Sequence, residues 1–149
     1  MLLIVIRHGL TTKGGELSPE GLRQVERLSD RLWDLGARVE RAVSATSLAS
    51  TSTASMLLDR LGRESPLDVR PLAGRALAPP KSRRFLSDLV TADRHTLIVG
   101  GEDILEVVRS LIRPVPLGHG FGRLLAVRGN GVLRGCWGLG PIAIEKQAA

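Results

Sequence analysis

The chain has 149 residues, which suffice for one domain with a hydrophobic core but not for two ordinary domains, so we expect a single domain over residues 1–149. Hydrophobic residues make up 43% and charged residues 24% of the chain, fractions typical of globular proteins, which exclude a disordered chain and a membrane protein. The net charge of +6 favours anionic partners, but aromatic residues amount to only 3% and offer little surface for base stacking, which argues against a nucleic-acid-binding protein.

The segment Leu2 to Ile6 is predicted to form a central strand, because it is a continuous apolar run rich in β-branched residues. No basic residue precedes this run and no small-residue cleavage site follows it, so we do not expect a signal peptide. A cytoplasmic location follows as the default expectation. The single cysteine, Cys136, has no partner for an intramolecular disulfide or for a metal motif.

Alternating helices and strands are expected after this first strand. The best-supported helix has Ser18 as its N-cap and Pro19 at its first position, and apolar residues then recur at helical spacing until Gly36. Further strands are expected at Arg41–Ser44, Leu67–Arg70 and Thr96–Val99, and further helices at Thr46–Leu61, Arg83–Val90 and Glu102–Ile112. The first half of the second helix is rich in serine and threonine, which are mediocre helix formers, so we expect tight packing or a polar neighbour there.

The C-terminal part is predicted to form a β-hairpin, in which Gly129-Asn130-Gly131 joins strands at Arg123–Arg128 and Val132–Trp137. Alternating strands and helices followed by a hairpin predict an α/β fold. We therefore expect a three-layer sandwich with helices on both faces of a mostly parallel central sheet and an antiparallel hairpin at its edge.

The tripeptide Arg7-His8-Gly9 is the strongest candidate for chemistry, because it directly follows the first strand, and ligands of open α/β sheets bind beyond the carboxyl ends of strands. A neutral imidazole can attack phosphorus when its other ring nitrogen is held by a hydrogen-bond acceptor. The adjacent arginine offers a planar fork for two phosphate oxygens, and the glycine lets the backbone approach a ligand closely. Taken alone, the tripeptide is equally typical of a surface loop at a strand end.

The tripeptide and the segment Leu17 to Val25, which reads Leu-Ser-Pro-Glu-Gly-Leu-Arg-Gln-Val, together resemble the opening of the histidine phosphatase (phosphoglycerate mutase-like) superfamily. In that superfamily a helix with the pattern Leu-Thr-x-x-Gly-x-x-Gln-Ala follows the catalytic loop. The resemblance covers the chain to about Ile112, and in its small size without an inserted cap the chain is most similar to the SixA-type phosphohistidine phosphatases. It implies that His8 is the transient phosphoryl acceptor, that Arg7 and Thr11 bind the phosphoryl group, and that neither a metal nor a cofactor is needed.

Two positions depart from the pattern of that superfamily. Its second motif reads roughly Ser-Pro-x-x-Arg-Ala, and the matching segment has Leu48 where the second phosphate-binding arginine belongs. Its later motif is an apolar strand that ends in Gly-His, and here Gly101 stands at the position of the second catalytic histidine. No arginine lies between Arg41 and Arg60 and no histidine lies between His95 and His119, so a shifted alignment restores neither group.

Other residues are candidates to replace the missing groups. His119 precedes the predicted hairpin, and it lies at the same sheet edge as His8 if that strand is antiparallel; the alternative is a glycine-flanked surface histidine. Glu102 follows Gly101 at a predicted helix start, where it is either an acid for catalysis or simply favourable with the helix dipole. His95 precedes its strand and therefore belongs to the opposite edge, so we expect no role for it.

A cationic cluster of Lys81, Arg83 and Arg84 lies near the long irregular connection that follows residue 70. These side chains either overhang the site and attract an anionic ligand or form a solvated face.

Two functions are consistent with these observations. The first is a phosphohydrolase whose partner is a phosphorylated small molecule or a phosphoprotein, phosphohistidine included. The second is a catalytically inactive relative that acts as an anion-binding or protein-interaction module. Loss of one preorganised donor typically slows an enzyme about 10²- to 10³-fold, which leaves room for turnover. We favour the phosphohydrolase, because Arg7 and His8 are intact at the expected place.

Overall fold

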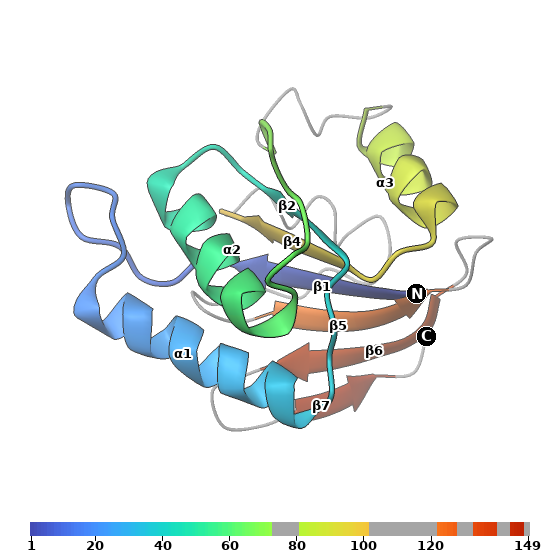
Figure 1. Cartoon of the computed structure of the whole chain (residues 1–149), viewed down its shortest axis with the longest axis horizontal. Helices are drawn as coiled ribbons and strands as arrows, with labels where there is room; N and C mark the ends of the chain where they lie inside the picture. Colours follow the sequence, from blue (N-terminus) through green and yellow to red (C-terminus); the bar gives the residue numbers. More distant parts are fainter. Residues whose placement is uncertain (73–80, 102–121, 128–132, 140–143, 148–149) are drawn as a thin grey trace.

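The computed structural model describes residues 1–72, 81–101, 122–127, 133–139 and 144–147 (Figure 1). The strands are β1 (Leu2–Arg7), β2 (Arg41–Ser44), β3 (Leu67–Val69), β4 (Thr96–Gly100), β5 (Gly122–Val127), β6 (Leu133–Leu139) and β7 (Ile144–Gln147). The helices are α1 (Pro19–Asp34), α2 (Leu48–Leu61) and α3 (Lys81–Ala92). The helix expected at Glu102–Ile112 lies outside the described residues.

The described strands form one seven-stranded sheet in the order β3-β2-β4-β1-β5-β6-β7. Strands β3, β2, β4 and β1 are parallel, whereas β5, β6 and β7 continue the sheet as antiparallel strands. The predicted α/β fold, with a parallel part of four strands and an antiparallel C-terminal pair, is therefore confirmed. Strand β7 was not predicted, because its segment includes Glu145, Lys146 and Gln147 and has no apolar run.

The two central parallel strands, β1 and β4, are buried on both faces, as the apolar run of β1 predicts. Side chains alternate between the two faces of a strand, so Ile4 and Ile6 join α1 and α2 in one hydrophobic cluster while Leu3 and Val5 point the other way. All four are at most 1% exposed. The two helices lie next to each other over the same face of the sheet (Figure 1). Their contribution to the cluster is Val25, Leu28, Leu32, Ala54, Leu57, Leu58 and Leu61.

Helix α1 begins and ends where its sequence signals indicate. The hydroxyl of Ser18 accepts a hydrogen bond from the backbone N–H of Gly21 at 3.0 Å, and Pro19 takes the first helical position. After the helix, Gly36 adopts a φ of 71°, the left-handed conformation that commonly closes a helix.

Helix α2 begins at Leu48 rather than at the predicted Thr46, because Ser47 is its N-cap. The predicted tight packing of its hydroxyl-rich half is confirmed, since Ser50 and Thr53 are fully buried. Helix α3 is longer at both ends than the predicted Arg83–Val90. No helix in the described part of the chain is long and apolar enough to cross a membrane.

Candidate active site

The carboxyl ends of β1 and β4 meet at one edge of the sheet and bring His8 and Gly101 together. Arg7 pairs with Gly100 in the parallel register, and the backbone N–H of His8 donates to the carbonyl of Gly100 at 3.0 Å. A Cβ atom placed on Gly101 would lie 3.7 Å from Nε2 of His8. Two positions far apart in the sequence are thus neighbours, as their places at the ends of parallel strands predict.

The imidazole of His8 is oriented by the residue that follows it. Its Nδ1 lies 2.8 Å from the carbonyl oxygen of Gly9. Because a carbonyl oxygen only accepts hydrogen bonds, Nδ1 must donate, and in the neutral ring the lone pair then resides on Nε2. Nε2 is also the ring atom nearest to the Cβ position of Gly101. The contact of Nδ1 with the Gly9 carbonyl favours, for a neutral ring, the tautomer in which Nε2 can act as a nucleophile.

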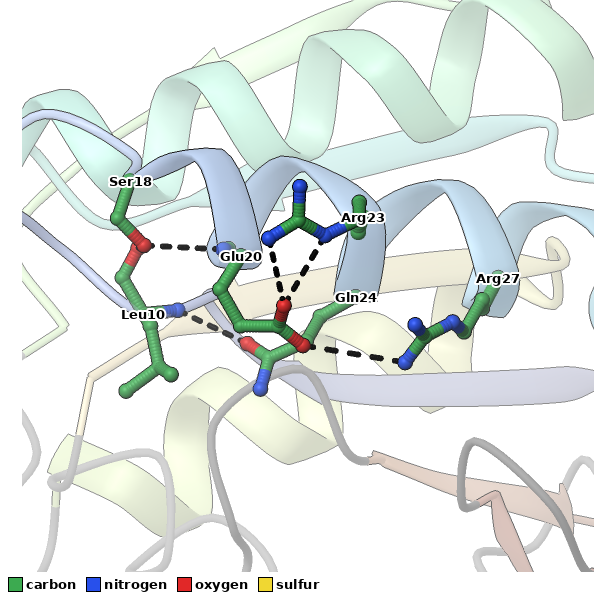
Figure 2. A network of polar contacts seen from close by, with 7 residues as sticks. Leu10, Ser18, Glu20, Arg23, Gln24 and Arg27 are labelled. Atoms are coloured by element: carbon green, nitrogen blue, oxygen red, sulfur yellow. Dashed lines mark hydrogen bonds and ion pairs between the residues drawn. The ribbon is translucent and has the colours of Figure 1, made fainter.

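The loop after His8 is held by the first two turns of α1 (Figure 2). The backbone N–H of Leu10 donates to Oε1 of Gln24 at 3.0 Å. The carbonyl of Leu10 accepts from Ser18 twice, from its backbone N–H at 2.9 Å and from its hydroxyl at 3.1 Å. Both backbone groups of Leu10 are thus bonded to the α1 end of the loop, which limits how far the loop can move.

Two glycines allow this loop to lie directly against α1. A Cβ atom on Gly9 would be 2.7 Å from the carbonyl oxygen of Gly21, and a Cβ atom on Gly21 would overlap the carbonyl oxygen of Leu10. The sequence interpretation assigned Gly9 to close approach of a ligand, whereas the structure shows that backbone packing requires a glycine there. Gly21 and Gln24 were missed as site residues, although both belong to the motif that follows the catalytic loop.

In the sequence, Arg7 directly precedes His8 and Thr11 follows it by three residues. Arg7 is the last residue of β1 and is half-buried, and the backbone of Thr11 forms an isolated bridge with Leu17. The side chain of Thr11 is exposed. Their phosphate-binding roles stay predictions.

The start of α2 lies at the same edge of the sheet. The backbone N–H of Ala45, directly after β2, donates to the carbonyl of Val99 in β4 at 2.9 Å. The hydroxyl of Ser47 then accepts from the backbone N–H of Ser50 at 3.2 Å and caps α2. Leu48 follows and is 58% exposed. The position where the resemblance expects an arginine therefore carries an exposed apolar side chain.

The other predicted residues lie elsewhere. His95 is at the opposite edge, as predicted: its Nδ1 accepts from the backbone N–H of Leu2 at 2.8 Å, where β1 begins. Glu102 and His119 lie outside the described residues. Lys81 and Arg84 are exposed on the first turn of α3. Within the described ranges, no three His, Cys, Asp or Glu side chains are placed to hold a metal ion.

Solved structures match nearly the whole chain, although no family model and no curated protein matches its sequence. The protein histidine phosphatase SixA complexed with tungstate superimposes with a TM-score of 0.79 and 17% identity, over 95% of this chain and 97% of that chain. The alpha-ribazole phosphatase from Shigella flexneri matches with a TM-score of 0.66 and 15% identity, over 89% of this chain and 93% of its own. The mycobacterial glucosyl-3-phosphoglycerate phosphatase matches with a TM-score of 0.62 and 14% identity, over 99% and 97% of the two chains.

These structures share one architecture with the chain, and the likeness extends over almost their full length. The buried β1 and the helix that follows its loop are those expected from the resemblance at Arg7-His8-Gly9. The chain therefore has the fold of the histidine phosphatase superfamily.

Proposed function

We propose that this protein is a phosphohydrolase in which His8 is the nucleophile and Arg7 and Thr11 bind the phosphoryl group. The observation that carries this proposal is the bond from Nδ1 of His8 to the Gly9 carbonyl at 2.8 Å, which leaves the lone pair on Nε2. The ring lies at the sheet edge where α/β proteins bind ligands. The structural neighbours are named as phosphatases, which supports the same chemistry. One of them is complexed with tungstate, a tetrahedral oxyanion like phosphate.

The proposed reaction has two steps. In the first, Nε2 of His8 forms a bond to phosphorus, the bond from phosphorus to the leaving oxygen or nitrogen breaks, and the leaving group takes up a proton. In the second, water attacks phosphorus, the phosphorus–nitrogen bond breaks, and phosphate leaves with a regenerated imidazole. Arg7 would balance the negative charge of the phosphoryl oxygens in both steps. Glu102 and His119 stay the candidates for the proton donor.

The proposed substrates are phosphorylated small molecules or phosphoproteins, phosphohistidine included. Leu48 and Gly101 provide no charge or proton where the superfamily pattern has an arginine and a histidine. Such losses slow catalysis, but enzymes accelerate phosphate-monoester hydrolysis by up to about 10²¹-fold, so a site with His8 and Arg7 retains ample capacity for turnover.

The test is intact-mass spectrometry of the full chain after incubation with phosphoramidate at neutral pH. We expect an acid-labile phosphoryl adduct on the wild-type protein and none on His8→Ala. The matched control is His95→Gln, which alters a histidine at the opposite edge of the sheet and should keep the adduct.

Phosphate release from a panel of phosphomonoesters and from phosphohistidine then measures turnover. Loss of release in His8→Ala, with release retained in His95→Gln, supports the proposal. An adduct that survives in His8→Ala, or the absence of both adduct and phosphate release in the wild type, contradicts it and favours the module that binds without turnover.

A further inference from the structure

A cavity of about 470 Å³ lies between the end of β3 and the first turns of α3. Its volume is in the range of small-molecule sites. Its lining includes three cations, one carboxylate and two buried apolar side chains, namely Arg70, Lys81, Arg84, Asp88, Leu72 and Phe85. An apolar floor with a cationic rim suits an organic anion better than a neutral ligand.

The cations around this cavity are only partly neutralised by the described part of the chain. Lys81 and Arg84 form no ion pair within 4.0 Å with any described residue. Arg70 is 3.7 Å from Asp68, and its guanidinium lies 5.3 Å from the centre of the Phe85 ring. The rim therefore keeps an excess of positive charge that a ligand can balance.

The start of α3 adds to this positive charge. Its first turn contains Lys81, Arg83 and Arg84 in sequence and no acidic residue. The N-terminus of a helix carries a partial positive charge, so acidic residues stabilise the first turn and cations destabilise it. Helix α1 has the ordinary arrangement, with Glu20 in its first turn. A local pattern that opposes helix stability is a mark of a functional site, and an anion bound here would remove the conflict.

We propose that this cavity binds a small organic phosphate or phosphonate. The anionic group would lie between Lys81 and Arg84 at the start of α3, and the carbon skeleton would cover Phe85 and Leu72, which are 7% and 2% exposed. The proposal does not depend on hydrolysis at His8.

The proposed site is separate from the His8 site. The backbone N–H of Arg70 donates to the carbonyl of Ser44 at the end of β2, and β4 separates β2 from β1. At a strand spacing of about 4.8 Å, Arg70 and His8 are thus roughly 15 Å apart across the sheet.

The test is a titration of the ¹⁵N-labelled full chain with phenylphosphonate, whose phosphorus–carbon bond withstands hydrolysis, followed by NMR. We expect the amide signals of the first two turns of α3 to shift. The double variant Lys81→Gln/Arg84→Gln should raise the dissociation constant read from these signals by about tenfold or more, which corresponds to a loss of about 1.4 kcal/mol in binding free energy. The double variant Arg38→Gln/Arg63→Gln removes the same charge from exposed arginines elsewhere and should bind like the wild type.

Binding at the two sites can be distinguished by the amide signals that shift, because binding at the proposed catalytic site shifts the signals around His8 and not those of α3. Unshifted α3 signals at millimolar phenylphosphonate, or equal affinity in the two double variants, would overturn the proposal. The same NMR titration with inorganic phosphate tests whether the ligand contacts the apolar side chains, because phosphate has no carbon skeleton. Weaker binding of phosphate than of phenylphosphonate supports contact with Phe85 and Leu72, and equal binding contradicts it.

Discussion

A Cβ atom added at Gly101 would lie 3.7 Å from Nε2 of His8, an ordinary van der Waals distance, and it would meet no other described residue more closely. We therefore expect Gly101→His to place a second imidazole at the phosphoryl group and to raise the rate of phosphate release. One preorganised donor is typically worth about 10²- to 10³-fold in rate. The measurement is kcat for phenyl phosphate, with Gly101→Ala as the matched variant that fills the same space without a donor. Equal rates for the two variants would contradict the expectation.

For single residues, the sequence predicted where the site residues lie better than it predicted their hydrogen bonds and packing contacts. His8 and Gly101 could be placed together because each directly follows an apolar run that becomes a parallel strand. The bond that orients the His8 ring could not be predicted, because its acceptor is the backbone carbonyl of Gly9, and every residue carries such a carbonyl. The packing reason for Gly9 was equally hidden, since it depends on Gly21, which is distant in sequence.

The contact between the His8 loop and α1 depends on the absence of side chains, so it can be tested by adding one carbon atom. We expect Gly9→Ala to lower the free energy of unfolding by about 1–3 kcal/mol, the usual cost of overpacking, because its Cβ would be 2.7 Å from the Gly21 carbonyl. Gly14→Ala is the control in the same loop, since its Cβ would meet nothing closer than 3.7 Å. Urea unfolding measures both, and a loss of stability in Gly14→Ala as large as in Gly9→Ala would show that the contact is unimportant.

The elements themselves were predictable where a cap or an apolar run marks them. Ser18 and Pro19 marked α1, and β2 was predicted with its observed bounds. Helix α2 begins two residues after its predicted start at Thr46. Thr46 and Ser47 are both residue types that cap helices, and only the structure shows that Ser47 is the N-cap. Strand β7 pairs with β6 without an apolar pattern of its own, so it depends on its neighbour rather than on its own sequence.

The whole molecule places its proposed anion sites at one edge and other cations at the opposite edge. Four parallel strands bring their carboxyl ends together, which puts His8 and Arg70 on the same edge. Arg38 and Arg63 lie in the connections that lead into β2 and β3, so they belong to the amino edge. The net charge of +6 is therefore less informative about function than the edge at which each cation lies.

This arrangement predicts that the site edge, and not the net charge alone, attracts an anionic substrate. We expect kcat/KM for phenyl phosphate to fall as sodium chloride is added, because the Debye length shrinks from about 30 Å at 0.01 M to about 10 Å at 0.1 M. Lys81→Gln/Arg84→Gln should flatten this dependence. Arg38→Gln/Arg63→Gln changes the net charge equally but at the other edge, and it should keep the wild-type slope. Steady-state kinetics over a salt series measures all three proteins, and identical slopes in the two double variants would mean that total charge, rather than its position, controls association.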